Sequence, residues 1–271
     1  MNLFARLRRR LRRPNVLWQR NEMSQSASQL ELERLLAQSS STVDLGCGVN
    51  PVKGAVAAID LFTDSRHRGP GKLPVIQPKD LEARGIQFVN QSIDNPLPFS
   101  DGGFEFAHCS HVIEHVEAPG RACDEMMRIA TTGLLRCPSA MIEFMCGRPY
   151  HRWLVIHRGS RVVFVEKAEG EYGIFGDFAA VSGSTVNPFE AMLDWEGERP
   201  ATPNRGILGR LKRRLQGLFF GRKPQTEVNL FWSGGFFWTE IRRNGAQIQG
   251  GRPGLVWWFD ETGLRRECGS A

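Results

Sequence analysis

The strongest constraint on the fold of this chain is a short apolar strand that runs directly into a glycine turn, within residues 43–51. The sequence there reads Asp44-Leu-Gly46-Cys47-Gly48, so two glycines follow the strand two positions apart. Glycine tolerates the tight backbone angles of such a turn, and its missing Cβ lets a ligand approach the main chain closely. The segment therefore predicts a nucleoside-binding turn at the end of the first strand.

The residues around this turn indicate which nucleoside it binds. The third glycine of the dinucleotide fingerprint is replaced here by Pro51, which argues against NAD. Asp44 adds a carboxylate beneath the turn, which would repel a pyrophosphate and suit the amino group and sulfonium of S-adenosylmethionine. We therefore predict S-adenosylmethionine as the cofactor, with Asp44, Gly46, Cys47 and Gly48 in its binding site.

Two more strands follow the glycine turn. Residues 55–62 form an apolar run with Asp60 near its end, where a carboxylate can hold the ribose hydroxyls of a nucleoside. Residues 86–89 read as a third strand. Only about seven residues separate Gly48 from the second strand, fewer than a parallel crossover with a helix needs. The first crossover is therefore expected to be abbreviated.

These features belong to a longer ordered set of motifs between about residues 40 and 167. The set comprises Asp-Leu-Gly-Cys-Gly, Asp60, Leu97-Pro98-Phe99 with Asp101 and Phe104, Ser110-His111-Val-Ile-Glu114-His115-Val116, Glu125-Met-Met-Arg128, Arg136-Cys-Pro138-Ser139, His151-Arg-Trp153 and Val162-Val-Phe164-Val-Glu-Lys167. In this order it resembles the class I S-adenosylmethionine-dependent methyltransferases, in particular the type 11-like branch of bacterial glycan biosynthesis. The resemblance implies an α/β fold with a Rossmann-like open, mostly parallel sheet, helices on both faces, and the cofactor at the carboxyl ends of the first strands.

The resemblance also assigns roles to residues after the third and fourth strands. Many relatives carry an acidic residue that faces the adenine amino group, but the matching position here is Ser92. Ser92, the backbone of Ile93, or Asp94 could make this contact, and the sequence leaves the choice open. Ser110 and His111 are expected nearest to the methyl group that is transferred.

Methyl transfer is an in-line displacement, so most of its catalysis comes from positioning the acceptor. A base is needed only for a hydroxyl acceptor. His111 is the first candidate because imidazole titrates near neutral pH. His151 is the second and could instead bind the acceptor, while Arg152 and Trp153 would suit an anionic group and a sugar ring. The predicted acceptor is a hydroxyl or similar group of a glycan, a lipid-linked molecule or a small molecule.

The segment His111-x-x-Glu114-His115 must also be weighed as the inverted zinc-protease motif. On a helix both histidines would share one face and could bind zinc, with Glu114 as base and the distant Glu190 completing the site. The apolar strand before the segment and the upstream glycine turn favour the methyltransferase interpretation, so no metal is predicted. An inactive methyltransferase-like binding module is a further alternative. Glu114 and His115 are expected to pack and hydrogen-bond at a helix start.

Net charge is distributed very unevenly along the chain. The total is +6, but residues 1–20 and 205–223 each contain seven basic residues and no acidic one, so the remainder has 21 basic against 29 acidic residues. Both segments also carry leucines at helical spacing, a pattern typical of helices that lie on an anionic membrane surface. Nucleic acid is a less suitable partner, because the acidic remainder would repel its phosphates. The basic residues are Arg6, Arg8, Arg9, Arg10, Arg12, Arg13 and Arg20, then Arg205, Arg210, Lys212, Arg213, Arg214, Arg222 and Lys223.

Cysteine usage and hydropathy favour a cytoplasmic protein. The six cysteines include no Cys-x-x-Cys pair, and no apolar run approaches the length of a membrane span. The arginine-rich start lacks the apolar region of a signal peptide. We expect a cytoplasmic location, with peripheral attachment to the inner face of the membrane through the basic segments.

Four segments are predicted along the chain. Residues 1–22 form a basic amphipathic arm, residues 23–168 the cofactor-binding core, and residues 169–226 an insertion or lid with the second basic helix. Residues 227–271 are expected to form a C-terminal excursion. Its hairpin pairs two alternating runs, 227–232 and 236–241, that flank Ser-Gly-Gly.

Overall fold

The computed structural model describes residues 16–61, 76–140, 143, 148, 150–167, 227–260 and 262–269. Both basic clusters, at residues 6–13 and 210–223, lie outside these ranges, as does the insertion predicted for residues 169–226.

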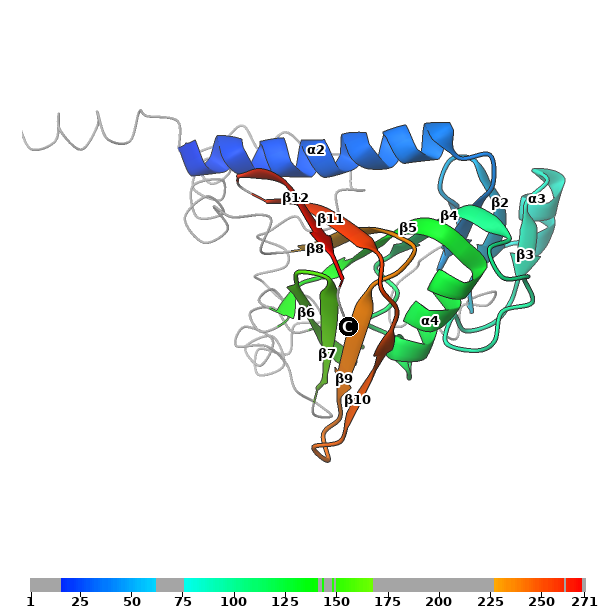
Figure 1. Ribbon diagram of the computed structural model, residues 1–271. Helices are drawn as coiled ribbons and strands as arrows, with labels where there is room; N and C mark the ends of the chain where they lie inside the picture. The colour runs from blue at the N-terminus through cyan, green and yellow to red at the C-terminus, as the bar shows by residue number, and fades with distance from the viewer. Residues whose placement is uncertain are drawn as a thin grey trace, which may run out of the picture.

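A large mixed sheet forms the centre of the protein, with eight strands in the order β12-β11-β8-β5-β4-β1-β2-β3 (Figure 1). Strands β1 to β5 run parallel to one another, whereas β8, β11 and β12 each run antiparallel to the strands beside them. The predicted open, mostly parallel Rossmann-like sheet is confirmed. The strands are β1 (Thr42–Leu45), β2 (Ala55–Ile59), β3 (Gln87–Val89), β4 (Phe104–Ser110), β5 (Ala130–Pro138), β8 (Glu227–Ser233), β11 (Leu255–Asp260) and β12 (Gly263–Cys268).

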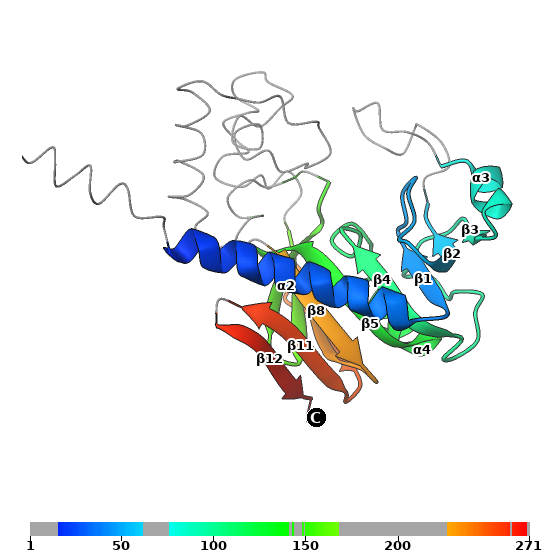
Figure 2. The ribbon, with the colours of Figure 1, turned by 90° about the horizontal axis from the view of Figure 1, so that it is seen from above.

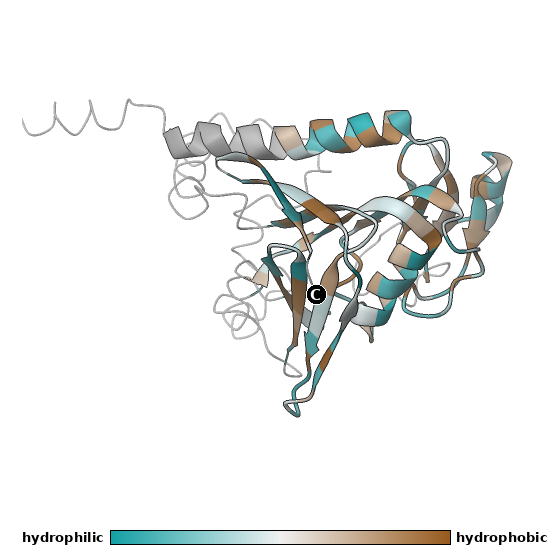
Figure 3. Ribbon diagram, in the orientation of Figure 1, coloured by the Kyte–Doolittle hydropathy of each residue, from teal (hydrophilic) through white to brown (hydrophobic). Residues whose placement is uncertain are grey.

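Different elements cover the two faces of this sheet because successive side chains of a strand point to opposite sides. Phe106, Leu134 and Phe231 pack with Leu32 of α2 (Val16–Gln38), which crosses the sheet on one face (Figure 2). Helix α3 (Pro78–Ala83) covers β2 and β3 on the same face. The neighbouring strand positions contribute to the main core with the buried side of α4 (Pro119–Ile129) on the other face. Helices therefore lie on both faces, and Figure 3 shows that apolar and polar residues alternate along them.

A second sheet shares the α4 face, and the sequence did not predict it. Its order is β10-β9-β7-β6, formed by β6 (Trp153–Arg158), β7 (Arg161–Glu166), β9 (Phe237–Ile241) and β10 (Gln247–Gly251). Trp153, Phe164 and Phe236 are fully buried where this sheet meets the main core.

The predicted pairing of the C-terminal hairpin is wrong, although C-terminal hairpins are present. Strand β8 pairs with β5 and β11 in the large sheet, while β9 pairs with β7 and β10 in the small one. The Ser-Gly-Gly segment therefore leads the chain from one sheet to the other, and the hairpins are β9–β10 and β11–β12. The boundary predicted at residue 22 falls inside α2, while the boundary at residue 168 adjoins the predicted insertion, which lies outside the described residues.

The expected abbreviation of the first crossover is confirmed, because residues 46–54 contain only turns and irregular backbone. Among the described helices, none is long and apolar enough to cross a membrane.

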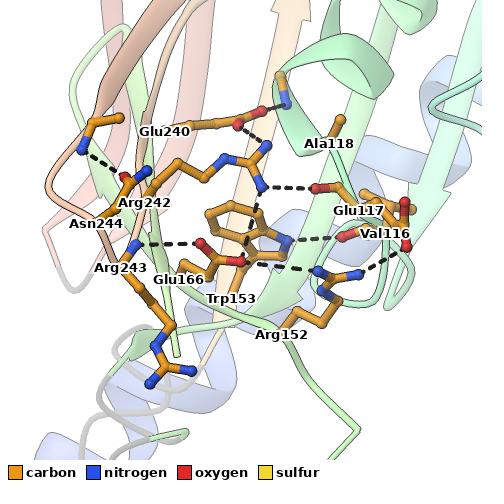
Figure 4. A network of polar contacts seen from close by, with 12 residues as sticks. Val116, Glu117, Ala118, Arg152, Trp153, Glu166, Glu240, Arg242, Arg243 and Asn244 are labelled. Atoms are coloured by element: carbon orange, nitrogen blue, oxygen red, sulfur yellow. Dashed lines mark hydrogen bonds and ion pairs between the residues drawn. The ribbon is translucent and has the colours of Figure 1, made fainter. Parts of the chain in front are cut away.

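Hydrogen bonds and an ion pair connect the small sheet to α4 and to the loop before it (Figure 4). Glu240 of β9 accepts a hydrogen bond from the Gly120 amide in the first turn of α4 at 2.7 Å, and its other oxygen pairs with Arg242 at 2.6 Å. The Arg242 guanidinium lies 4.8 Å from the centre of the Trp153 ring. Trp153 donates its indole N–H to the Val116 carbonyl at 2.8 Å. One carboxylate thus caps a helix and holds the arginine that covers the buried tryptophan.

Backbone conformation and side-chain packing both require glycine at position 46 of the glycine turn. Gly46 has φ of 77°, and a Cβ there would meet the Val112 side chain at 2.0 Å. Gly48 has φ of 56°, but a Cβ there would meet nothing within 4 Å. The sequence predicts that a ligand approaches the backbone closely at both glycines. The space for this is open only at Gly48, whereas at Gly46 it is filled by the Val112 side chain.

We expect Glu240→Ala to lower the free energy of unfolding by roughly 2–3 kcal/mol, because α4 loses a cap and Arg242 loses its partner. Urea denaturation measures this change. Glu82→Ala removes an exposed carboxylate of α3 and should change the free energy by less than about 0.5 kcal/mol. Equal losses in the two variants would show that Glu240 does not join the helix to the sheet.

We expect Gly46→Ala to cost roughly 2–4 kcal/mol of stability, since it adds both backbone strain and overlap with Val112. Gly48→Ala is the matched control and should cost only the strain of its positive φ, about 1–2 kcal/mol. In a Val112→Ala background the cost of Gly46→Ala should fall by at least about 1 kcal/mol. The same cost in both backgrounds would exclude Val112 as its source.

Candidate active site

The predicted site residues gather where the parallel strands β1, β2, β4 and β5 end. Open α/β sheets bind ligands at this carboxyl edge. A surface cavity of about 470 Å³, lined by Gly102, Arg128, Ala130 and Ser233 among others, lies at the opposite edge, where β4 and β5 begin. We therefore place the candidate site at the carboxyl edge and not in that cavity.

Asp44 is buried and bonded within the protein. One of its oxygens accepts a hydrogen bond from the Val52 amide at 2.7 Å, and the other lies 2.8 Å from Nδ1 of His108, its neighbour across β1 and β4. The carboxylate therefore closes the loop after the glycine turn. Its negative charge does lie beneath the turn, as expected, but both oxygens already have protein partners.

Asp60 orients the glycine turn from the end of β2. Its Oδ2 accepts a hydrogen bond from the Gly48 amide at 2.8 Å, and the amides of Gly46 and Cys47 both donate to the Ile59 carbonyl. The Cys47 side chain is buried among the residues that pack under α3. Cys47 thus contributes its backbone to the turn, while its thiol belongs to the core.

The three candidates for the adenine contact have different surroundings. The Ile93 side chain is buried in the main core. Ser92 and Asp94 are hydrogen-bonded to each other, and Asp94 also accepts a bond from the Ala118 amide at 2.9 Å, just before α4. Asp94 therefore has a structural partner at the start of the helix. The adenine contact through Ser92, the Ile93 backbone or Asp94 stays a prediction.

Ser110 and His111 stand at the end of β4, as predicted. His111 has φ of 56°, unusual for a residue other than glycine, and its amide donates to the Arg136 carbonyl at 2.9 Å. Its ring lies 3.7 Å from Glu114 and 3.6 Å from Glu227. Burial alone would lower the pKa of His111, but hydrogen bonding and attraction to these two carboxylates raise it to about 9. The expectation of an imidazole that titrates near neutral pH is therefore wrong, and His111 is a cation at pH 7.

The segment between β4 and α4 is not helical, which overturns the premise of the zinc-protease interpretation. Residues 111–118 form turns and bends, and α4 begins only at Pro119. His111 and His115 therefore do not share a helix face, and Glu190 lies outside the described residues. Glu114 packs in the protein interior as expected, but the hydrogen bond expected for it at a helix start is not found among the described residues. Its side chain is buried, and neither oxygen has a hydrogen-bond partner in the described part of the chain.

His151 is brought next to this segment by the small sheet. The Arg152 amide, just before β6, donates to the Glu114 carbonyl at 2.8 Å. His151 is buried, with Nδ1 2.5 Å from Glu143 and Nε2 4.0 Å from Glu114. Lys167 lies 3.3 Å from the same Glu143. Burial would raise the pKa of Glu143, but its bond to His151, the charge of Lys167 and the hydrogen bond from the Arg148 amide lower it.

The two other residues proposed to bind the acceptor have different surroundings from each other. Trp153 is fully buried and belongs to the core, so it does not present its ring to a sugar. Arg152 is partly exposed and pairs with Glu117 at 3.2 Å. The structure adds Glu143, Glu227 and Lys167, none of which the sequence singled out as site residues. Only the tertiary fold reveals them, because they lie on segments distant in sequence from Glu114.

A family model described as a methyltransferase domain matches residues 43–135, about a third of the chain. No match is found among curated proteins.

Several solved structures resemble part of the chain. An S-adenosylmethionine-dependent methyltransferase from Thermotoga maritima, described as a possible histamine N-methyltransferase, is 19% identical with a TM-score of 0.32 and covers 45% of this chain and 54% of its own. The [4+2]-cyclase SpnF is 20% identical with a TM-score of 0.31 and coverages of 43% and 46%. A methyltransferase from Aquifex aeolicus is 12% identical with a TM-score of 0.29 and coverages of 42% and 64%. The chain thus spans about half to two thirds of these structures, and likenesses of this size carry no argument about function.

The family match falls on the segment from β1 to β5, which contains the glycine turn, Asp60 and the residues after β4. Residues 43–135 therefore match a methyltransferase domain, and the cofactor of this family is S-adenosylmethionine.

Proposed function

We propose that the protein transfers a methyl group from S-adenosylmethionine to an acceptor bound beside the end of β4. The observation that carries this proposal is the arrangement of Gly48 and Asp60. Asp60 is fixed at the end of β2 by the Gly48 amide, and the position of a Cβ on Gly48 is open. A nucleoside that approaches this turn meets an exposed backbone and a carboxylate suited to ribose hydroxyls.

S-adenosylmethionine supplies an activated methyl group when bound. Asp60 would hold the ribose, the backbone at Gly48 would pack against the nucleoside, and Ser92, Ile93 or Asp94 would contact the adenine. Ser110 and the charged His111 would then orient the acceptor from the end of β4. Orientation alone can supply several kcal/mol of the reduction in barrier, so the reaction does not require His111 to act as a base.

For the acceptor, we propose a hydroxyl or similar group of a glycan or lipid-linked glycan. The support comes from the motif resemblance and from the two basic segments at residues 6–13 and 210–223, which would bring the protein to an anionic membrane surface. An assay with a labelled methyl donor on glycan and lipid extracts separates an active enzyme from a cofactor-binding module. Label in neither extract would favour the inactive module or a small-molecule acceptor.

We expect Asp60→Ala to weaken binding of S-adenosylhomocysteine by about 1–3 kcal/mol, since the ribose loses hydrogen bonds to a charged group. Isothermal titration calorimetry measures this affinity. Asp60→Asn can still accept the hydrogen bond from the Gly48 amide, so it should lose less affinity for S-adenosylhomocysteine. Asp80→Ala, an exposed carboxylate in the first turn of α3, is the control and should bind as the wild type does. Wild-type affinity in Asp60→Ala would contradict this placement of the pocket.

We expect the full chain to sediment with anionic vesicles at low salt and to remain in solution with neutral vesicles. Each Lys or Arg near an anionic surface contributes roughly 1 kcal/mol of attraction, which salt screens. Deletion of residues 1–13 together with charge reversal at Arg210, Lys212, Arg213 and Arg214 should release the protein. Failure of the intact protein to sediment with anionic vesicles would remove the membrane proposal and leave cofactor binding unaffected.

A further inference from the structure

The buried carboxylate of Glu114 faces His111, whose Nδ1 lies 3.7 Å from its Oε1, and two further histidines, His115 and His151. Its Oε1 lies 4.0 Å from Nε2 of His115 and 4.0 Å from Nε2 of His151. One ligand atom from each of Glu114, His115 and His151 falls within 4.8 Å of the others. The Glu114 side chain is 1% exposed, and neither of its oxygens is hydrogen-bonded by any residue that the structure describes. A carboxylate in this position requires compensation for its lost hydration.

Both histidine rings are oriented by their other nitrogen. Nδ1 of His115 donates to the Tyr150 carbonyl at 3.3 Å, and Nδ1 of His151 is bonded to the Glu143 carboxylate at 2.5 Å. With protons on both Nδ1 atoms, the Nε2 lone pairs of both rings are directed toward Glu114. Metal-binding histidines characteristically donate their second ring nitrogen to a carboxylate or a backbone carbonyl, which fixes the tautomer and the ring.

From these observations we propose that Glu114, His115 and His151 bind a divalent transition metal ion of the zinc type. Two imidazole nitrogens and one carboxylate oxygen form a donor set that zinc accepts, with a fourth position left for water or another ligand. Tetrahedral coordination would bring the donor atoms to about 3.3 Å from one another. The Glu114 oxygen would move about 0.7 Å closer to each histidine nitrogen, from 4.0 Å, and the widest separation among the three atoms, at most 4.8 Å, would contract by up to about 1.5 Å.

The solvent exposure of the three ligands differs, which fits a site that is open on one side. His151 and Glu114 are each 1% exposed, whereas the His115 side chain is 36% exposed. The two buried ligands, Glu114 and His151, would therefore hold the ion on its inner side, and solvent would reach the ion beside His115. This site differs from the zinc-protease pattern, which requires His111, a residue whose ring lies between Glu114 and Glu227.

Titration of the full-length protein with Co²⁺ tests the proposal directly, because tetrahedral cobalt absorbs visible light. The protein is used without a histidine tag, after treatment with a chelator, and in the absence of cofactor. We expect one cobalt ion per chain, displaced by Zn²⁺, with no thiolate-to-metal band. A thiolate band would assign the ion to cysteine, for instance the exposed Cys268. Either that band or no stoichiometric binding would overturn the proposal.

Variants then assign the ligands. His115→Gln changes a partly exposed side chain and should weaken Co²⁺ binding by more than about 100-fold, while Glu143→Gln leaves all three ligands in place and should weaken it by about 10–100-fold. The control is His157→Gln in β6, whose ring instead contacts the Gly159 carbonyl at 2.6 Å, and it should bind as the wild type does. Zn²⁺ should raise the melting temperature of the wild type and of His157→Gln but not of His115→Gln. Wild-type affinity in a folded His115→Gln protein would refute this ligand set.

The metal site goes beyond methyl transfer, since neither the cofactor nor an acceptor takes part in this binding. Loss of S-adenosylhomocysteine binding in Asp60→Ala and loss of Co²⁺ binding in His115→Gln are therefore expected to be independent. If the wild-type protein binds cofactor but no Co²⁺, the metal site is rejected and the cofactor pocket stands. If it binds Co²⁺ but no cofactor, the cofactor pocket is rejected and the metal site stands.

Discussion

Two hydrogen bonds between the small sheet and the loop before α4 determine the composition of the candidate site. The Arg152 amide donates to the Glu114 carbonyl, and the Trp153 indole donates to the Val116 carbonyl. Because Trp153 is fully buried and β6 begins there, these bonds fix the start of the strand against the loop after β4. His151, one residue earlier than Arg152, is thereby held beside Glu114. A sheet that is absent from the sequence prediction thus contributes residues to the site that the large sheet alone would lack.

The acidic residues near the carboxyl edge fall into two classes that the sequence does not separate. Asp44 and Asp94 accept hydrogen bonds from the Val52 and Ala118 amides, so they hold loops in place. The Glu114 carboxylate is equally buried but receives no hydrogen bond from the described residues. Buried carboxylates with amide donors stabilise local structure, whereas Glu114 has no amide donor and faces the charged ring of His111 at 3.7 Å and the rings of His115 and His151 at 4.0 Å. The hydrogen-bond partners of a buried carboxylate therefore distinguish one that stabilises local structure from one that can bind a cation.

The elements predictable from sequence were those set by local pattern. The apolar runs and the glycine turn located β1, β2 and Asp60 because strand burial and turn chemistry act over a few residues. The path of the chain after β8 was not predictable, because Ser-Gly-Gly serves a hairpin as well as a change of sheet. Only tertiary packing decided between them, by pairing β8 with β5 and β9 with β7. The same limit explains why Glu143 and Glu227 were missed, since their role depends on neighbours distant in sequence.

His111 shows how tertiary context changes the chemistry of a correctly located residue. Its place at the end of β4 follows from the motif, but its charge follows from Glu114 and from Glu227 of β8, more than a hundred residues later in the chain. Together these carboxylates outweigh the effect of burial and raise the pKa of the ring to about 9. A protonated imidazole donates hydrogen bonds and cannot accept a proton. At neutral pH both ring nitrogens of His111 face carboxylates, so the end of β4 offers a positive charge, and the catalytic contribution that remains for it is orientation of the acceptor.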